Sequence, residues 1–500
     1  MAKLTHAIRD TVFSTLDSPY KDSLEAWREA FARTLIPDLM QDDHKADFAD
    51  MCAQTIAYGF FAARCHHDPS KGEFERKNAQ DDIPKTNPLL RSLFASLTGP
   101  EFKDEPYFQF VEDLIQLLAL ADMYSVLKDF GERDRRTDPV IHFYETFLSV
   151  YDPALREKRG VYYTPEPVVS WLVRSADAVV RQKFSIPQGL ADSFFKLKQV
   201  NATTGATTTL PKVLILDPAC GTGTFLYETI ALIRDRLMEQ GQGGTWSAYV
   251  RENLLPRIFG FELLMAPYAV AHFKMGMQLA GYDMPGAERT PWAYDFASAE
   301  RLKIFLTNTL EEAEQALQMN LPGFMKALSD ESQAAREIKT TLPILVIMGN
   351  PPYSGHSANA SVKKVSTGKH RHGKPVLKTI RTLIGSLIEE YKQINGVPLG
   401  ERQQKWLQDD YVKFIRWVQW KLDRVGEDVV TFVTNHGYLD NPTFRGMRYS
   451  LLRSFDEIYV YDLHGSWSSP RLNRTPCPSE EVGLEICPDL VLRSFPRSRW

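Results

Sequence analysis

Residues 213–226 read Val-Leu-Ile-Leu-Asp-Pro-Ala-Cys-Gly-Thr-Gly-Thr-Phe-Leu, and this stretch decides the fold. Its apolar start predicts a buried strand, Gly221 and Gly223 allow a tight turn, and Thr224 opens a helical pattern. A strand, a glycine turn and a helix in this order are typical of a nucleoside-binding site. The third glycine of the dinucleotide pattern is missing and Asp217 precedes the turn, which argues against a pyrophosphate ligand. S-adenosylmethionine fits such a site.

The surrounding sequence predicts an α/β fold. From residue 212 onward, apolar strands such as 344–348 and 429–433 alternate with helical patterns, which is typical of a doubly wound Rossmann-like sheet. Before about residue 130, segments such as 23–31 and 108–127 have helical spacing and almost no strand signal. We therefore predict an all-helical domain ahead of the sheet.

A second motif, Gly-Asn-Pro-Pro-Tyr at 349–353, follows an apolar run. The Asn350 amide oxygen and the Pro351 carbonyl can accept hydrogen bonds from a planar amino group, and Tyr353 can stack on the ring that carries it. Pro351 and Pro352 also lack the N–H donors that would compete for these acceptors. A plain strand followed by a Pro-Pro turn is the alternative interpretation. The glycine turn upstream favours the functional one.

With both motifs, the chain resembles the S-adenosylmethionine-dependent DNA adenine amino-methyltransferases of the gamma arrangement, in which the cofactor motif precedes the catalytic motif. Residues 159–165 resemble the family's Tyr-Thr-Pro segment, and 258–262 resemble the strand whose carboxylate holds the ribose hydroxyls. Residues 304–310 resemble the strand that meets the adenine, and 410–414 the helix whose aromatic residue packs near the cofactor. The resemblance implies that the cofactor is bound by Tyr163, Thr164, Pro165, Asp217, Ala219, Gly221, Gly223, Thr224, Phe225, Glu262, Asn308 and Phe414. For Phe225, ordinary core packing is an equal alternative.

Residues 434–439 and 444–448 extend the resemblance to large single-chain restriction-modification enzymes, which combine a nuclease, a translocase and a methyltransferase. The part before residue 151 resembles their helical coupler. We therefore expect a helical coupler-like domain at 1–150, a methyltransferase domain at 151–465 and an irregular tail at 466–500. The family continues with a lysine-rich loop and a target-recognition domain where this tail stands. Either the tail is flexible, or a frameshift or truncation replaced the native continuation.

The resemblance implies transfer of a methyl group from S-adenosylmethionine to the exocyclic N6 amine of an adenine flipped out of double-stranded DNA. Asn350, Pro351, Pro352 and Tyr353 would form the catalytic motif. A protein (glutamine) or RNA methyltransferase is one alternative, because glutamine-modifying enzymes also use Asn-Pro-Pro-Tyr. A non-catalytic fragment or subunit of a larger restriction complex is another. The resemblance also implies a restriction-modification or phage-defence system as the setting. A nuclease, translocase or specificity partner is then expected.

A basic stretch at 362–375 reads Val-Lys-Lys-Val-Ser-Thr-Gly-Lys-His-Arg-His-Gly-Lys-Pro, with no acid. The formal net charge of the chain is −4, so the local distribution of charge decides whether DNA can bind. A solvated mobile loop is one interpretation. Phosphate contact is the other, and it would involve Lys363, Lys364, Lys369 and Arg371.

Composition favours a cytoplasmic protein. The five cysteines are odd in number and scattered, which argues against a secreted disulfide framework, and their spacing predicts no metal site. No apolar run reaches the roughly 18 residues of a membrane span. No Gly-x4-Gly-Lys-Ser/Thr loop of the motor proteins is present either. The sequence therefore predicts no membrane association, no metal, and no motor in this chain.

Overall fold

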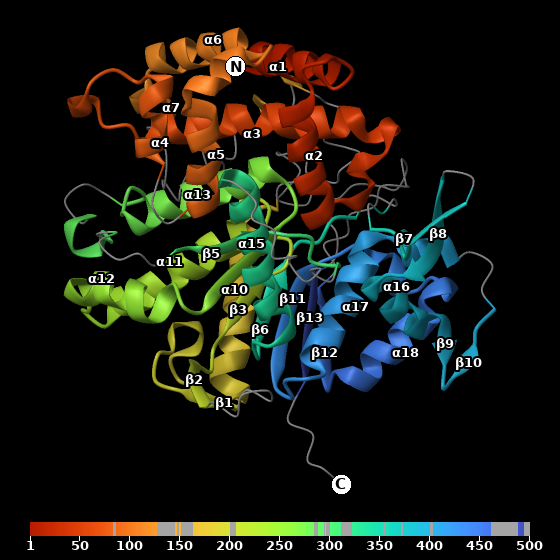
Figure 1. Ribbon diagram of the computed structural model, residues 1–500. Helices are drawn as coiled ribbons and strands as arrows, with labels where there is room; N and C mark the ends of the chain where they lie inside the picture. The colour runs from red at the N-terminus through yellow and green to blue at the C-terminus, as the bar shows by residue number, and fades with distance from the viewer. Residues whose placement is uncertain are drawn as a thin grey trace, which may run out of the picture. The chain divides into compact units, whose positions relative to one another are not determined.

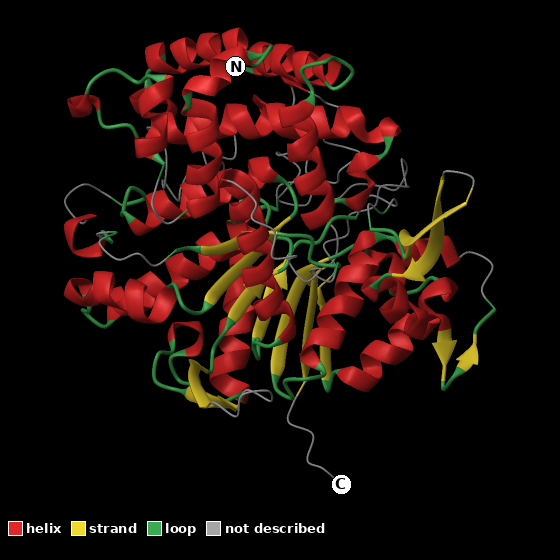
Figure 2. Ribbon diagram, viewed as in Figure 1, coloured by secondary structure: helices red, strands yellow, loops and turns green. Residues whose placement is uncertain are grey.

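Strands and helices alternate along much of the chain (Figure 1, Figure 2). The structure is a computed structural model, and it describes residues 1–83, 87–127, 146–147, 150–151, 164–200, 207–284, 289–294, 296, 301–311, 323–353, 357, 359–371, 374–400, 404–461 and 489–494. The chain divides into two compact units. Unit 1 comprises Met1–Val169, Ala191–Thr309 and Ala313–Leu342, and unit 2 comprises Ser170–Leu190, Leu310–Glu312 and Pro343–Trp500.

The N-terminal part of unit 1 is helical, as predicted. Its helices are α1 (Ala2–Thr15), α2 (Asp22–Thr34), α3 (Lys45–His66), α4 (Ala79–Asp82), α5 (Pro88–Thr98), α6 (Phe108–Leu120) and α7 (Met123–Leu127). Helix α3 is buried from Phe48 to Ala63, because it packs against α1, α6 and α13 (Met265–Leu279). A helix that is buried on all sides occupies such a central position.

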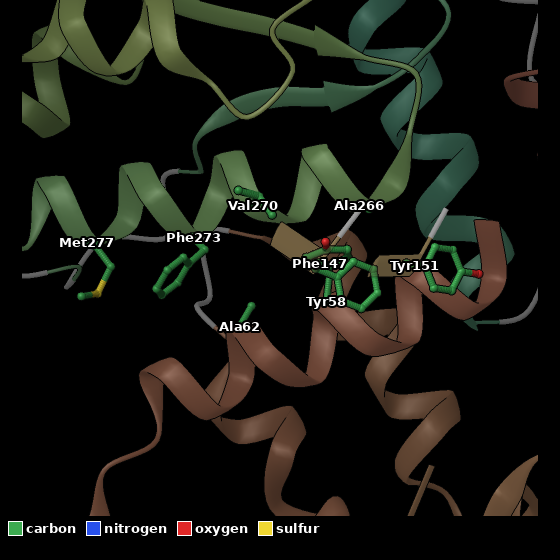
Figure 3. Close-up of a cluster of buried hydrophobic side chains, with 8 residues drawn as sticks. All are labelled: Tyr58, Ala62, Phe147, Tyr151, Ala266, Val270, Phe273 and Met277. Carbon is green, nitrogen blue, oxygen red and sulfur yellow. The ribbon is translucent and has the colours of Figure 1, made fainter. Parts of the chain in front are cut away.

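A cluster of buried side chains joins this helical region to the α/β part of unit 1 (Figure 3). It consists of Tyr58 and Ala62 of α3, Phe147 and Tyr151, and Ala266, Val270, Phe273 and Met277 of α13. The rings of Tyr58 and Phe147 meet edge to face, with centroids 4.9 Å apart. Nearby, the hydroxyl of Tyr268 on α13 donates to Asn87 Oδ1 at 3.1 Å, and Asn87 caps α5. The helical region and the α/β part of unit 1 therefore share one core.

The strands of unit 1 form a parallel set and a hairpin. Strands β3 (Ile215–Asp217), β4 (Ile258–Glu262) and β5 (Lys303–Leu306) run parallel in this order. Parallel neighbours need crossover connections, and helices α11 (Thr224–Glu239), α12 (Trp246–Tyr249) and α13 lie in them. The antiparallel hairpin consists of β1 (Lys196–Val200) and β2 (Thr207–Pro211). Helix α15 (Gly323–Thr340) follows β5 in the chain and packs against it.

Unit 2 repeats the alternation of strands and helices. Strands β6 (Val346–Gly349) and β11 (Asp428–Val433) are parallel neighbours. Its other strands are β7 (Val362–Arg371), β8 (Lys374–Arg381), β9 (Gln393–Ile394), β10 (Val397–Pro398), β12 (Glu457–Tyr461) and β13 (Asp489–Ser494). Its helices are α16 (Leu383–Leu387), α17 (Asp410–Leu422), α18 (Arg445–Ser454) and most of α10 (Glu166–Lys183). The α/β class with a helical N-terminal region is thus confirmed.

The C-terminal segment differs from the expected irregular tail. Asp489–Ser494 form β13, which pairs antiparallel with β11 on one side and with β12 on the other. Leu490, Val491 and Leu492 give this strand its apolar run. The prediction of an irregular tail at 466–500 is therefore wrong for these six residues, and the remainder of that tail lies outside the described residues. The domain boundaries at 150 and 465 stay predictions.

The basic stretch is a strand pair and not a simple loop. Val362–Arg371 and Lys374–Arg381 form the antiparallel β7–β8 hairpin (Figure 1). Its pairing has an irregularity between Ser366 and His370. Among the described helices, none is long and apolar enough to cross a membrane.

Candidate functional site

The turn after β3 has the conformation that its sequence predicts. Asp217 ends the strand with 1% of its surface exposed, and its Oδ1 accepts a hydrogen bond from the Ala219 backbone N–H at 3.1 Å. Gly221 and Gly223 have φ values of +54° and +82°, a region that side chains with a Cβ rarely adopt. Helix α11 begins at Thr224, so its first turn faces the loop.

Gly221 and Gly223 have different surroundings, so a side chain is excluded at each position for a different reason. Apart from Gly221 itself and its two chain neighbours, no described residue has an atom within 4 Å of a Cβ built on Gly221, so that position faces open space. A Cβ on Gly223 would collide with Met275 Cε and would lie 3.3 Å from Ala271 Cβ, both on α13. Gly223 therefore allows helix packing. Gly221 leaves room for a ligand beside the loop.

Glu262 connects the end of β4 to this glycine turn. Strand β4 lies beside β3, with Gly260 opposite Asp217. Glu262 Oε2 accepts from the Gly221 N–H at 2.9 Å, and Oε1 accepts from the N–H groups of Leu263 and Leu264 at 2.9 and 2.8 Å. A carboxylate has about four acceptor positions, so three backbone bonds leave room for a ligand hydroxyl.

Both carboxyl groups here have raised pKa values. Burial raises the pKa of Glu262 to about 7, against the opposing effect of its three backbone hydrogen bonds. Burial also raises the pKa of Asp217 well above its ordinary range, the Ala219 N–H acts in the opposite direction, and the charge of Glu262 raises it further. A cationic ligand would lower both pKa values. The site therefore favours a ligand that carries hydroxyls and positive charge, and S-adenosylmethionine has both.

Cofactor binding is expected to depend on pH through Glu262. Ribose hydroxyls donate to an ionised carboxylate, and this group is protonated below a pKa of about 7. Affinity for S-adenosylmethionine should therefore fall by up to about tenfold for each pH unit below 7, and the part of the profile that depends on Glu262 should level off above it. Calorimetry from pH 5.5 to 8.5 measures this. The Glu262→Gln variant should give a flatter profile, and a profile equal to the wild type's would contradict the assignment.

The loop after β5 borders the same turn. Thr309 Oγ1 donates to the Pro218 carbonyl at 2.5 Å, and the Asn308 amide donates from Nδ2 to the Leu35 carbonyl at 3.2 Å. Asn308 is 7% exposed. Its side chain thus contacts the helical region of unit 1, and a role toward the adenine stays a prediction.

Sequence reasoning missed Thr309 of this loop and Lys339, which binds the loop from α15. The buried Lys339 of α15 donates from Nζ to Thr307 Oγ1 at 2.9 Å and to the Asn308 carbonyl at 2.6 Å. Thr309 could have been found from the polar run that follows the strand. Lys339 gave no signal, because a lysine on an amphipathic helix is normally on the solvent side.

The remaining predicted cofactor residues have varied positions. Thr164 is buried and Pro165 half-buried, and the Pro165 carbonyl accepts the first hydrogen bonds of α10. Tyr163 lies outside the described residues. Phe225 is 3% exposed, which favours the core interpretation. Phe414 is a buried residue of α17 in unit 2.

The Asn-Pro-Pro-Tyr motif follows β6 directly, in unit 2. Strand β6 is buried throughout, and Gly349 pairs with Phe432 of the parallel strand β11. Pro351 is buried, whereas Asn350, Pro352 and Tyr353 are half-buried. The motif therefore lies where ligands bind in α/β proteins, at the carboxyl end of a parallel strand.

The structure brings Asp217, Ala219, Gly221 and Glu262 together within unit 1, and it places residues 350–353 in unit 2. Of the basic residues, Lys363 has a half-buried side chain with Nζ 3.9 Å from Glu311 Oε2. Lys364, Lys369 and Arg371 belong to β7, and their side chains lie outside the description. Among the residues with a described placement, no group of three or more His, Cys, Asp or Glu could hold a metal ion.

Comparison with known proteins finds a family match in the central segment. Residues 197–378 match the family described as MmeI, DNA-methyltransferase domain. The whole-chain fold is similar to that of DrdV in its DNA complex, with 21% identity and a TM-score of 0.60 over 99% of this chain and 40% of that one. It is also similar to the ATP-dependent Type ISP restriction-modification enzyme LlaBIII bound to DNA, with 20% identity and a TM-score of 0.64 over 100% of this chain and 28% of that one.

The chain spans less than half the length of these solved proteins. A search of curated proteins found no significant match. The segment that matches the family contains the glycine turn, Glu262 and the Asn-Pro-Pro-Tyr motif. Residues 197–378 thus match the MmeI DNA-methyltransferase domain family, and the fold of the chain is similar to that of DrdV and of LlaBIII.

Proposed function

We propose that this chain transfers a methyl group from S-adenosylmethionine to the N6 amine of an adenine flipped out of double-stranded DNA. The observation that carries the proposal is the position of Asn350-Pro351-Pro352-Tyr353. These residues follow a buried parallel strand directly, and they lie inside the segment that matches a DNA-methyltransferase domain. A half-buried amide, a proline carbonyl and a half-buried ring together suit a planar aromatic amine.

The cofactor is assigned to the turn after β3. Open space at Gly221, with the carboxyl groups of Asp217 and Glu262 hydrogen-bonded to the turn, fits a ligand with hydroxyls and positive charge. Glu262 would accept from the ribose hydroxyls. Asp217 would hold the Ala219 backbone in place, and the positive charge of the ligand would favour its ionised form. When bound, S-adenosylmethionine supplies a methyl group on a sulfonium, which is already activated toward a nucleophile.

The target amine is assigned to Asn350 and Pro351. The lone pair of this amine is delocalised into the adenine ring, which makes it a poor nucleophile. Hydrogen bonds donated to the Asn350 amide oxygen and the Pro351 carbonyl favour a pyramidal nitrogen and localise the lone pair as attack begins. Tyr353 would stack on the flipped base, which is worth roughly 1–3 kcal/mol. Much of the rate enhancement then comes from placing donor and acceptor in line.

The basic β7–β8 hairpin is assigned to DNA phosphates, and a duplex is the proposed partner. Replacing Lys363, Lys364, Lys369 and Arg371 by alanine should weaken DNA binding and leave cofactor binding unchanged. The slope of log affinity against log salt should flatten by roughly 0.9 for each phosphate that the variant no longer binds. Replacement of the exposed Lys196 and Lys198 in the β1–β2 hairpin is the matched control. An equal slope in both variants would mean that β7–β8 is an ordinary surface hairpin.

The proposed setting is a cytoplasmic restriction-modification or phage-defence system, with a nuclease, translocase or specificity partner. A methyl-transfer competition tests the proposal. The protein is incubated with radiolabelled S-adenosylmethionine and equal masses of duplex DNA, RNA and a protein extract. Label in DNA is expected. Label in protein would favour a glutamine methyltransferase, because that carboxamide presents the same planar amino group to Asn-Pro-Pro-Tyr. Binding of S-adenosylmethionine without any transfer would favour a non-catalytic subunit.

A further inference from the structure

A buried polar network lies shortly after the Asn-Pro-Pro-Tyr motif in unit 2. Asp410 begins α17, and its Oδ1 accepts hydrogen bonds from Ser357 Oγ at 2.5 Å and from Asn359 Nδ2 at 3.1 Å. Lys413, in the first turn of the same helix, donates from Nζ to Ser357 Oγ at 2.7 Å and to the Asn359 carbonyl. Lys413 is 1% exposed and Asp410 is 6% exposed. Asp410 and Lys413 therefore both form hydrogen bonds with Ser357 and Asn359.

The chain just beyond Asn359 is held through its backbone. The Ala360 carbonyl accepts from Thr382 Oγ1 at 2.9 Å, and the Ser361 carbonyl accepts from the Thr382 N–H at 3.2 Å. A Cβ on Gly385 would overlap the Ser361 carbonyl oxygen, so only glycine permits this approach of α16. Strand β7 begins at Val362, directly after Ser361. The network and these bonds therefore fix the point from which the basic hairpin extends.

Stability alone does not explain these two buried charged groups. Burial lowers the pKa of Lys413, while the charges of Asp410 and Asp409 act in the opposite direction. Apolar residues of similar volume commonly stabilise a protein as well as a buried ion pair does, because the pair must be desolvated. The charged side chains of Asp410 and Lys413 also form directional hydrogen bonds, and these hold the segment that they bind in one position. Here that segment contains Ser357 and Asn359.

We infer that Asp410 and Lys413 are positioning residues for methyl transfer: they hold Ser357 and Asn359, which lie in the chain between the Asn350–Tyr353 motif and the β7–β8 hairpin. Tyr353 is only four positions before Ser357, so the position of Ser357 limits where the motif can lie. The inference rests on the proposed function, because it assigns this segment to placement of the target amine. A displacement of about 1 Å at a reacting group lowers a rate by roughly 10²-fold.

Lys413→Met tests this, because methionine keeps most of the side-chain length and removes the donors. Arg416→Met is the matched control: Arg416 lies on the same helix, is 5% exposed, and instead binds the Leu387 carbonyl and Glu390. We expect Lys413→Met to lower kcat for DNA methylation about tenfold to a hundredfold more than Arg416→Met does, with KM for S-adenosylmethionine within about threefold. Asp410→Asn keeps an Oδ1 acceptor and should retain more activity than Asp410→Ala.

Hydrogen exchange tests whether this segment is held, and it does not depend on catalytic activity. The Asn359 N–H reports on the segment because it is bonded to Ser357 Oγ at 3.0 Å. Exchange in a peptide spanning 357–361 should accelerate in Lys413→Met and stay at the wild-type rate in Arg416→Met. Equal losses of kcat in the two variants, or unchanged exchange in Lys413→Met, would overturn the inference. A wild-type protein that methylates no DNA would contradict the proposed function instead. The exchange result would then still decide whether the segment is held.

Discussion

Replacing Asn350 by alanine is expected to abolish methyl transfer while affinity for S-adenosylmethionine stays within a few fold of the wild type. The amide oxygen is one of two acceptors proposed for the target amine. Loss of one preorganised polar partner of a developing charge costs on the order of 10²–10³ in rate. The hydrogen bonds of Asp217 and Glu262 are accepted from backbone N–H groups of residues 219–264 and do not involve Asn350, so the groups assigned to the cofactor should keep their arrangement.

Calorimetry and single-turnover methylation of DNA, done on the same preparation, check this prediction. Tyr353→Phe is the control, because it keeps the stacking ring and should retain most of the rate. Tyr353→Ala removes the ring and should lose most of the rate. Parallel loss of cofactor binding and transfer in Asn350→Ala would mean that Asn350 supports the fold and does not act on the amine.

Gly221→Val is expected to abolish cofactor binding and to leave the fold largely intact. Gly221 has a φ of +54° and open space where its Cβ would lie. The added side chain would therefore occupy the space assigned to the ligand. Holding a residue with a Cβ in this conformation costs roughly 1–2 kcal/mol, which a domain of ordinary stability tolerates.

Gly241→Val separates strain from ligand exclusion. Gly241 follows α11 with a φ of +69°, and its Cβ position is also open among the described residues. Both variants should lower the melting temperature by a similar amount, and only Gly221→Val should lose the cofactor. Gly223→Val is a different case: its side chain would collide with α13, so global destabilisation is expected there. Unchanged calorimetric affinity in Gly221→Val would refute the assignment of the turn.

Local signals explain what the sequence could predict. The turn at Gly221 and Gly223 follows from residues adjacent in the chain, because a strand, positive φ angles and a helix start leave a contiguous pattern. The motif at 350–353 was found in the same way, as an apolar run ending in two prolines. Glu262 needed one further step, since the spacing to Asp217 is long, yet an apolar strand ending in an acid was still a local pattern.

Pairing over longer distances explains what was missed. The β7–β8 hairpin depends on pairs such as Val365 with Lys378, whose partners give no signal in a lysine-rich segment. Strand β13 pairs with strands that end well before it in the chain, and a serine- and proline-rich stretch conceals it. In residues 410–414 the resemblance pointed only to the aromatic Phe414, and no local pattern marks Asp410 and Lys413. Only the fold brings Ser357 and Asn359 to them.

Nucleoside analysis of DNA methylated by this protein tests the proposed N6 chemistry without any assumption about the recognition site. The chain and its Asn350→Ala variant are expressed in a host without DNA methylation, and genomic DNA is digested to nucleosides and measured by mass spectrometry. We expect N6-methyladenine with the wild type and none with the variant, and sequencing of the same DNA should then give the recognition site. N4-methylcytosine in place of N6-methyladenine, or equal N6-methyladenine with both proteins, would contradict the proposed methyl transfer to adenine.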